Sequence, residues 1–168
     1  MSSFNGRPHT LSVLVENRPG VLTRVAGLFA RRGYNIDSLA VAATADPGVS
    51  RMTVVVRAED EFVLGQICRQ VGKLVDVISV TDHTGESVVA RELALVKVNC
   101  ADHSRSEIMQ IINCFRARTV DIADGELVIE VTGAHEKLDA MLRLLQKYGI
   151  LEIARTGEII LARGLQPT

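Results

Sequence analysis

The amino-acid sequence predicts an α+β protein built from two tandem βαββαβ domains, each an antiparallel sheet with helices on one face. Two observations carry this prediction. Apolar residues recur at the helical spacing i, i+3, i+4, i+7 in four segments, and strand-like apolar runs flank those segments. The resulting order, strand, helix, strand, strand, helix, strand, occurs twice along the 168 residues. This order is typical of ferredoxin-like layers.

Four apolar quartets define the predicted helices. They are Leu22/Val25/Ala26/Phe29, Leu64/Ile67/Cys68/Val71, Ile108/Ile111/Ile112/Phe115 and Leu138/Met141/Leu142/Leu145. The first helix is followed by Gly33 after two arginines, which suits a glycine cap and the negative end of the helix dipole. Acidic residues 59–61 suit the start of the second helix, and Ser104 with Glu107 forms a possible capping box for the third.

The predicted strands are apolar runs bounded by turn signals. They are LSVLV, NIDSLAVAAT, RMTVVVRA and VDVISVTD in the first half, and LALVKV, TVDIAD, ELVIEVTG and ILEIARTGEIILAR in the second. Asp46–Gly48 and Asp124–Gly125 predict turns, the latter being the better hairpin signal. A polar stretch around 82–92 separates the halves and predicts domains of residues 1–82 and 83–168.

Both faces of the predicted sheets carry apolar side chains. Leu14 points away from the face formed by its neighbours in the first strand, and Val55 opposes Val54 and Val56. In the fourth strand, Val75 and Val77 are expected to oppose Ile78 and Val80. Because a half-exposed antiparallel sheet has a more polar outer side, we infer that the second faces or edges pack against the other half, a second copy or a different subunit. A slightly apolar monomer is the plainer alternative.

Composition narrows the class of protein. Hydrophobic residues make up 47% and charged residues 23%, as in a globular protein. The net charge of -1 disfavours nucleic-acid binding, which normally needs a basic face. The sequence has no apolar run of the ~18 residues that a membrane span needs and no signal-peptide pattern at its start. We therefore expect a cytoplasmic protein that binds neither nucleic acid nor membrane.

The cysteines and histidines predict no metal centre. Cys68, Cys100 and Cys114 form no CxxC pair, and the four histidines have no ligand spacing. Cys68 and Cys114 fall near apolar helical positions, so we expect them to be small buried residues. A disulfide or metal role is the alternative for these cysteines.

The stretch ENRPG, Glu16–Gly20, turns a predicted strand into a predicted helix. It lacks the spacing of GxGxxG or GxxxxGK[ST], so a nucleotide phosphate is disfavoured. A smaller anion such as a carboxylate suits the free amides and positive dipole at the start of the helix. Asn17 and Asn35 each offer an amide that can donate and accept, and Ile36 adds apolar surface. The plain alternative is an ordinary turn that binds nothing.

The sequence gives little support for an enzymatic function of this chain. The sequence brings together no Ser/His/Asp or Cys/His arrangement, and its carboxylates are dispersed over positions expected at the surface. We therefore predict no catalytic residue, and no enzyme activity in this chain alone.

Longer segments carry a family resemblance. The run LSVLVENRPGVLTRVAGLFARRGYNIDSLAVAATADPGVSRMTVVV resembles the N-terminal ACT domain of acetohydroxyacid synthase (acetolactate synthase) small subunits. The run LVIEVTGAHEKLDAMLRLLQKYGILEIARTGEIILARG is similar to the C-terminal, ACT-like domain of the same subunits. The segments GLFARRGYNIDSL and SRMT are the more specific motifs. The resemblance covers about residues 9–165.

The resemblance implies a regulator of branched-chain amino-acid synthesis. In the family, a separate large catalytic subunit uses thiamine diphosphate, FAD and magnesium to condense pyruvate with pyruvate or 2-oxobutanoate. The small subunit raises that activity and confers feedback inhibition, usually by valine. The resemblance thus implies a homodimer that binds the large subunit, with no cofactor in this chain. Another branched-chain amino acid could replace valine as effector.

By the family's motif, the effector lies between the ACT domains of two copies. The matching positions are Asn17, Gly20, Val21 and Leu22, together with Asn35 and Ile36. On geometric grounds we assign the first four to one copy and the last two to the other. Arg18 and Pro19 stand where members vary, and we expect them to tune affinity. The rival hypothesis is a stand-alone amino-acid-sensing ACT protein that acts through a transcriptional partner, but such a protein would not need the motifs of the second half.

Overall fold

The computed structural model describes residues 6–164 and 168. By contact, the chain divides into a first unit, Met1–Val89 with Ile159–Thr168, and a second unit, Ala90–Glu158. The predicted division at residue 82 differs from this grouping, because residues 83–89 and 159–164 group with the first unit. None of the described helices is long and apolar enough to cross a membrane.

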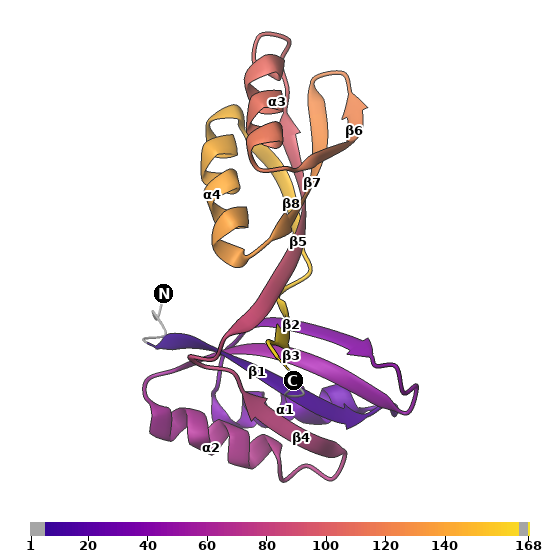
Figure 1. The fold of residues 1–168 in the computed structure, drawn as a ribbon, viewed down its shortest axis with the longest axis vertical. Coiled ribbons are helices and arrows are strands. Elements are labelled where there is room, and N and C mark those ends of the chain that lie inside the picture. The colour runs from indigo at the N-terminus through magenta and orange to yellow at the C-terminus, as the bar shows by residue number, and fades with distance from the viewer. Residues whose placement is uncertain (1–5, 165–167) are drawn as a thin grey trace. The chain divides into compact units, whose positions relative to one another are not determined.

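The first unit is a four-stranded antiparallel sheet with two helices on one face (Figure 1). Its elements are β1 (Arg7–Glu16), α1 (Val21–Arg32), β2 (Ile36–Ala43), β3 (Val49–Ala58), α2 (Glu61–Val71) and β4 (Val77–Asp82). The strand order is β2-β3-β1-β4, which makes β2 and β4 the edges. Leu11, Val54 and Phe29 belong to the core between the sheet and the helices.

The second unit repeats this architecture. Its elements are β5 (Val88–Asn99), α3 (Arg105–Cys114), β6 (Arg118–Ala123), β7 (Glu126–Gly133), α4 (His135–Leu145), the 3-10 turn η1 (Gln146–Tyr148) and β8 (Ile150–Arg155). The strand order is β6-β7-β5-β8. The ninth strand, β9 (Ile159–Ala162), belongs to the first unit. Val96, Ile129 and Leu138 belong to a second core. The predicted fold class, two tandem βαββαβ units, is therefore confirmed.

Local sequence signals set most element ends. Gly33 adopts φ 70° after α1, and Gly125 adopts φ 82° in the β6–β7 hairpin. The Asp60 side chain accepts a hydrogen bond from the Val63 amide and caps α2. The predicted capping box at α3 is wrong, although Ser104 is the first residue before the helix. Its hydroxyl donates to the Ala101 carbonyl instead, because the residues before it already form a turn.

Strand β4 differs from its prediction. It begins at Val77, so Val75 lies outside the strand and is 91% exposed. The register against β1 shifts between Leu14 and Val15, which leaves Ile78 unpaired in a bulge. A bulge interrupts the alternation of faces. Val77 and Val80 therefore both pack on the core, and the predicted opposition between them is wrong.

The predicted strand 150–163 is two strands. Residues 156–158 separate β8 from β9, and Gly157 adopts φ 79° between them. Residues Ile159–Leu161 of β9 lie beside Arg51 and Thr53 on the outer face of the first sheet. The chain's own C-terminal part thus covers some of the surface that the sequence predicts to be covered.

The cysteines are only partly where the sequence predicts them. Cys68 is half-buried and packs against the first core, as expected of a small apolar residue. Cys114 is exposed, so its predicted burial is wrong, because α3 ends there and its last turn faces outward. Burial raises the pKa of the Cys68 thiol, which disfavours the reactive thiolate.

Candidate functional site

The turn between β1 and α1 brings six of the predicted site residues together. Gly20 is the residue before α1 and adopts φ 84°, ψ -7°, in the left-handed region that favours glycine. Pro19 precedes it, and the Arg18 side chain pairs with Glu16 at 3.1 Å on the surface. Val21 is buried, so only its backbone is available to a ligand, whereas the Leu22 side chain is 44% exposed.

Asn17 ties this turn to the next one in the sheet. Its side-chain nitrogen donates to the Pro47 carbonyl at 2.9 Å, and its backbone amide donates to the Gly48 carbonyl at 2.8 Å. The β2–β3 turn is closed in its own right, since the Gly48 amide donates to Asp46 at 2.8 Å. Asn17 therefore holds two turns together, and its side-chain oxygen faces no donor among the described residues.

The N-terminal end of α1 has free donors. The Gly20 residue provides no side-chain cap, and the first turn contains no acidic residue. Within the part of the chain that the structure describes, the backbone amides of Leu22 and Thr23 have no acceptor. Unpaired amides and the positive end of the helix dipole together favour a small anion at this position.

Arg24 adds a positive charge beside these amides. Its Nε donates to Asp76 Oδ2 at 2.6 Å, and Asp76 is only 7% exposed. A Cβ built on Gly20 would lie 3.1 Å from Arg24 Nη1, so the guanidinium stands directly over the turn. The Asp76 backbone carbonyl also accepts from the Glu16 amide. Sequence reasoning missed this pair; a cation in the first helical turn, where acids are usual, is the signal that could have found it.

Asn35 and Ile36 lie at the other end of α1. They follow Gly33, and twelve helical residues span about 18 Å at ~1.5 Å per residue. The Asn35 side chain donates to Asp37 Oδ1 at 2.7 Å, and Ile36 is half-buried against the first core. Within one chain, the two predicted groups of site residues therefore lie at opposite ends of α1.

A second polar cluster lies in the second unit. Arg155 donates to both oxygens of buried Glu92, at 2.7 and 2.6 Å, and to Asp139 at 2.8 Å. His135 approaches the same two carboxylates at 3.2 Å. Burial acts to raise the pKa of Glu92, but the Arg155 guanidinium outweighs it and holds this pKa below its usual value. Every group in this cluster is paired, which is typical of a structural network rather than a ligand site.

Comparison with known proteins relates both units to the same group of proteins. Residues 11–79 match the family model of the "AHAS small subunit-like ACT domain", and residues 91–164 match that of the "small subunit of acetolactate synthase". An acetolactate synthase small subunit of Mycolicibacterium smegmatis is 52% identical over 161 residues, 95% of this chain and 94% of the relative. The Bacillus subtilis small subunit is 49% identical, over 93% and 91% of the two chains.

A solved structure shows the same fold. The crystal structure of the acetolactate synthase small subunit from Thermotoga maritima aligns with a TM-score of 0.86 at 41% sequence identity. The alignment covers 95% of this chain and 99% of that one.

Proposed function

Since this chain belongs to the acetolactate synthase small-subunit family, we propose that it activates the catalytic large subunit and makes it sensitive to feedback inhibition by valine or a related branched-chain amino acid. A small subunit of this enzyme implies a catalytic large-subunit partner. The thiamine diphosphate, FAD and magnesium belong to that partner in this proposal, and this chain carries no catalytic residue.

The β1–α1 turn is the observation that supports an amino-acid effector. Free amides at Leu22 and Thr23, together with the Arg24 guanidinium, suit the carboxylate of an amino acid. The exposed Leu22 side chain offers apolar surface to a branched side chain. The Asn17 side-chain oxygen is a suitable acceptor for an ammonium group.

The second half of the effector site comes from another copy of this chain. Asn35 and Ile36 lie about a helix length from the turn in one chain, so a homodimer is needed for both groups to touch one effector. Valine then inhibits because it binds more tightly to the dimer arrangement that disfavours the active large subunit. Coupling of this kind is typically ~1–3 kcal/mol.

The substitution Gly20→Asp tests the proposal. Aspartate tolerates the left-handed backbone better than most residues, and its carboxylate would occupy the anion position beside Arg24. We expect the variant to activate the large subunit as the wild type does but to lose inhibition by valine. The measurement is acetolactate synthase activity of the reconstituted holoenzyme as a function of valine concentration.

Gly125→Asp is the matched control. Gly125 has nearly the same φ, 82°, and nothing lies within 4 Å of a Cβ built on it. This variant carries the same backbone strain and charge in the second unit, and it should keep valine inhibition. Wild-type valine inhibition in Gly20→Asp would remove the turn from the effector site.

A further inference from the structure

A nearly buried carboxylate adjoins the proposed effector turn without belonging to it. Asp76 lies in the connection between α2 and β4 and is only 7% exposed. Backbone bonds fix its place at the end of the sheet, because the Asp76 carbonyl accepts from the Glu16 amide at 2.9 Å. On its other side, the Val77 amide donates to the Leu74 carbonyl at 3.0 Å. A buried charge needs a partner of opposite sign, and α1 supplies one.

The bond between Asp76 and Arg24 sets the direction of the guanidinium. Arg24 Nε donates to Asp76 Oδ2 at 2.6 Å, and Asp76 engages neither of the Nη groups. The donors of a guanidinium form a rigid planar fork, so a bond at Nε determines where the Nη groups point. Nη1 lies 3.1 Å from the position of a Cβ built on Gly20. The pair therefore directs donors at the turn where the effector carboxylate is expected.

Arg24 needs this partner to hold that direction. A cation in the first turn of a helix is repelled by the helix dipole, and an arginine side chain loses much rotamer freedom when a ligand orders it. The Arg24 side chain is 46% exposed, so packing alone does not confine it. A bond to a fixed carboxylate removes this freedom before the ligand arrives, and such preorganisation raises affinity.

The turn carries no excess of positive charge. Its two arginines are each paired with an acid, Arg24 with Asp76 at 2.6 Å and Arg18 with Glu16 at 3.1 Å. A third acid, Asp46, lies in the adjoining β2–β3 turn. A simple anion therefore meets directed donors but little net attraction, whereas the same acids attract the ammonium group of an amino acid. This balance suits a zwitterion better than a simple carboxylate.

We propose that Asp76 is a positioning residue of the effector site, which acts through Arg24 and makes the site prefer a zwitterion to a simple anion. It holds the guanidinium by Nε so that the Nη groups meet the effector carboxylate, and its charge cancels that of Arg24. Asp76 itself does not touch the effector. This role rests on the proposed function and adds to it a residue outside the turn and a basis for specificity.

A double-mutant cycle tests whether Asp76 acts through Arg24. The variants of the full-length protein are Asp76→Asn, Arg24→Gln and the two combined, and calorimetry measures the dissociation constant for valine. Asparagine is nearly the size of aspartate and keeps an oxygen for the Nε donor, so the substitution removes the charge but not the shape.

The cycle should show strong coupling. Asp76→Asn should weaken valine binding about threefold to tenfold when Arg24 is present, because a preorganised side chain becomes less ordered. In the Arg24→Gln background the same substitution should change the affinity about twofold or less. An equal loss in both backgrounds would overturn the proposal, because a residue that merely maintains the fold would act without Arg24.

Isovalerate (3-methylbutanoate) tests the specificity, because it is valine without the ammonium group. The wild type should bind valine more tightly than isovalerate. In Asp76→Asn, the uncancelled charge of Arg24 attracts both carboxylates but repels the valine ammonium group. The ratio of the isovalerate to the valine dissociation constant should therefore fall about threefold or more. An unchanged ratio in Asp76→Asn, or equal affinities for the two ligands in the wild type, would overturn the proposal.

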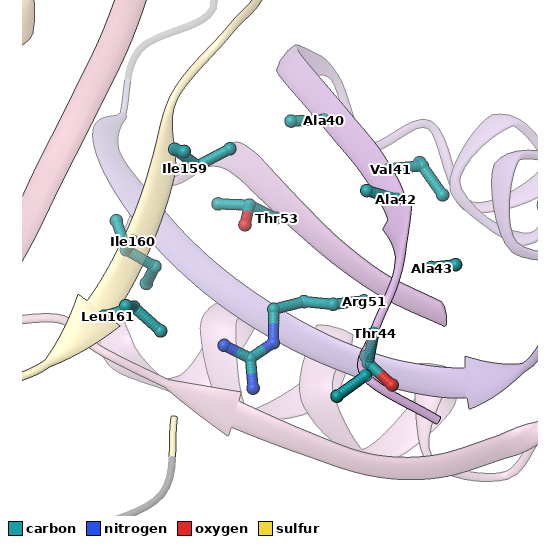
Figure 2. Close-up of a pocket in the computed structure, with 11 residues that line it drawn as sticks. Ala40, Val41, Ala42, Ala43, Thr44, Arg51, Thr53, Ile159, Ile160 and Leu161 are labelled. Carbon is teal, nitrogen blue, oxygen red and sulfur yellow. The ribbon is translucent and has the colours of Figure 1, made fainter. Parts of the chain in front are cut away.

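Arg51→Gln is the matched control for the loss of an arginine from the first unit. Arg51 lies on the face of the sheet opposite the core, where it lines a cavity together with Thr53 and Ile159 (Figure 2). This variant should bind valine and isovalerate as the wild type does. Equal weakening of valine binding by Arg51→Gln and Arg24→Gln would overturn the proposal, because any lost arginine would then have the same effect.

Gly20→Asp distinguishes failure of this role from failure of the proposed function. If Gly20→Asp binds valine as the wild type does, the turn is not the effector site, and the role of Asp76 falls with it. If Gly20→Asp loses valine binding while Asp76→Asn keeps the wild-type affinity and ligand ratio, the proposed function stands and only the role of Asp76 is overturned.

Discussion

At the scale of single residues, Arg24 shows how a side chain acquires its role from a partner far away in the sequence. A cation in the first turn of α1 is unfavourable for the helix dipole by itself. Asp76, fifty-two positions later, holds the guanidinium with one short bond and is itself nearly buried. The pair therefore keeps a positive charge over Gly20 and joins α1 to the segment before β4.

Removing this cation should destabilise the first unit. Arg24→Gln leaves the Asp76 carboxylate buried without its partner, and we expect a loss of about 1–2 kcal/mol in the free energy of unfolding. The relief of an unfavourable helix-dipole interaction offsets part of the cost. Urea unfolding at neutral pH measures the change.

Arg18→Gln is the control for this substitution. Arg18 is 69% exposed in its side chain and pairs with an accessible Glu16, and such surface pairs contribute only ~0–1 kcal/mol. Equal losses of stability in the two variants would show that the Arg24–Asp76 pair contributes no more to the free energy of unfolding than the exposed Arg18–Glu16 pair does.

At the scale of elements, the Glu92–Arg155–Asp139 cluster joins β5, β8 and α4. Glu92 stands in β5 opposite Gly133 of β7, and Arg155 pairs in register with Ala94. Asp139 reaches the same guanidinium from the helix. The bond from Arg155 also lowers the pKa of Asp139. The ion pairs thus fix how α4 and the edge strand meet the sheet.

This cluster predicts the pH dependence of the second unit. The folded-state pKa of Glu92 lies below its unfolded value of ~4.3. Its contribution to stability is therefore fully present above that unfolded value and is lost as the pH falls through the folded-state pKa. Glu92→Gln should lower the free energy of unfolding at pH 7, and its difference from wild type should shrink as the pH falls below about 4.

Urea unfolding at a series of pH values checks this expectation. Glu152→Gln is the matched control, because Glu152 is an exposed carboxylate on the same strand as Arg155. The control should follow the wild type at each pH. A Glu92→Gln variant whose deficit stayed constant from pH 7 to acid would show that the lowered pKa of Glu92 contributes nothing to stability.

At the scale of the whole molecule, the chain has two separate cores. The first contains Ile67 and the second contains Ile129, both completely buried, and the two clusters share no residue. Each unit has its own antiparallel sheet and helices. The duplication seen in the sequence is thus a duplication of complete hydrophobic cores.

We expect substitutions in the two cores to act separately. Ile67→Ala and Ile129→Ala should each cost about 2–5 kcal/mol, because each leaves a cavity in a packed core. Hydrogen exchange of the full-length protein should show lost protection mainly in the unit that carries the substitution. Comparable loss of protection in both units from either variant would contradict this independence.

The sequence by itself determined the element order, the fold class and most helix ends. These features rest on periodicity and on turn chemistry at Gly33, Asp60 and Gly125, which act within a few residues. The sequence also identified the β1–α1 turn as a candidate anion site, because a strand, a glycine turn and a helix start are contiguous. Asn35 and Ile36 stay a prediction for the second half of that site.

The tertiary structure alone decided the features that depend on distant residues. The bulge at Ile78 follows from pairing with β1, the pairing of Arg24 follows from the position of Asp76, and the place of β9 follows from contacts with the first unit. The cavity around Arg51 likewise needs β3 and β9, which lie about a hundred residues apart in the chain. Local patterns carry no information about such pairs, because burial and hydrogen bonding between distant segments arise only when the sheet has formed.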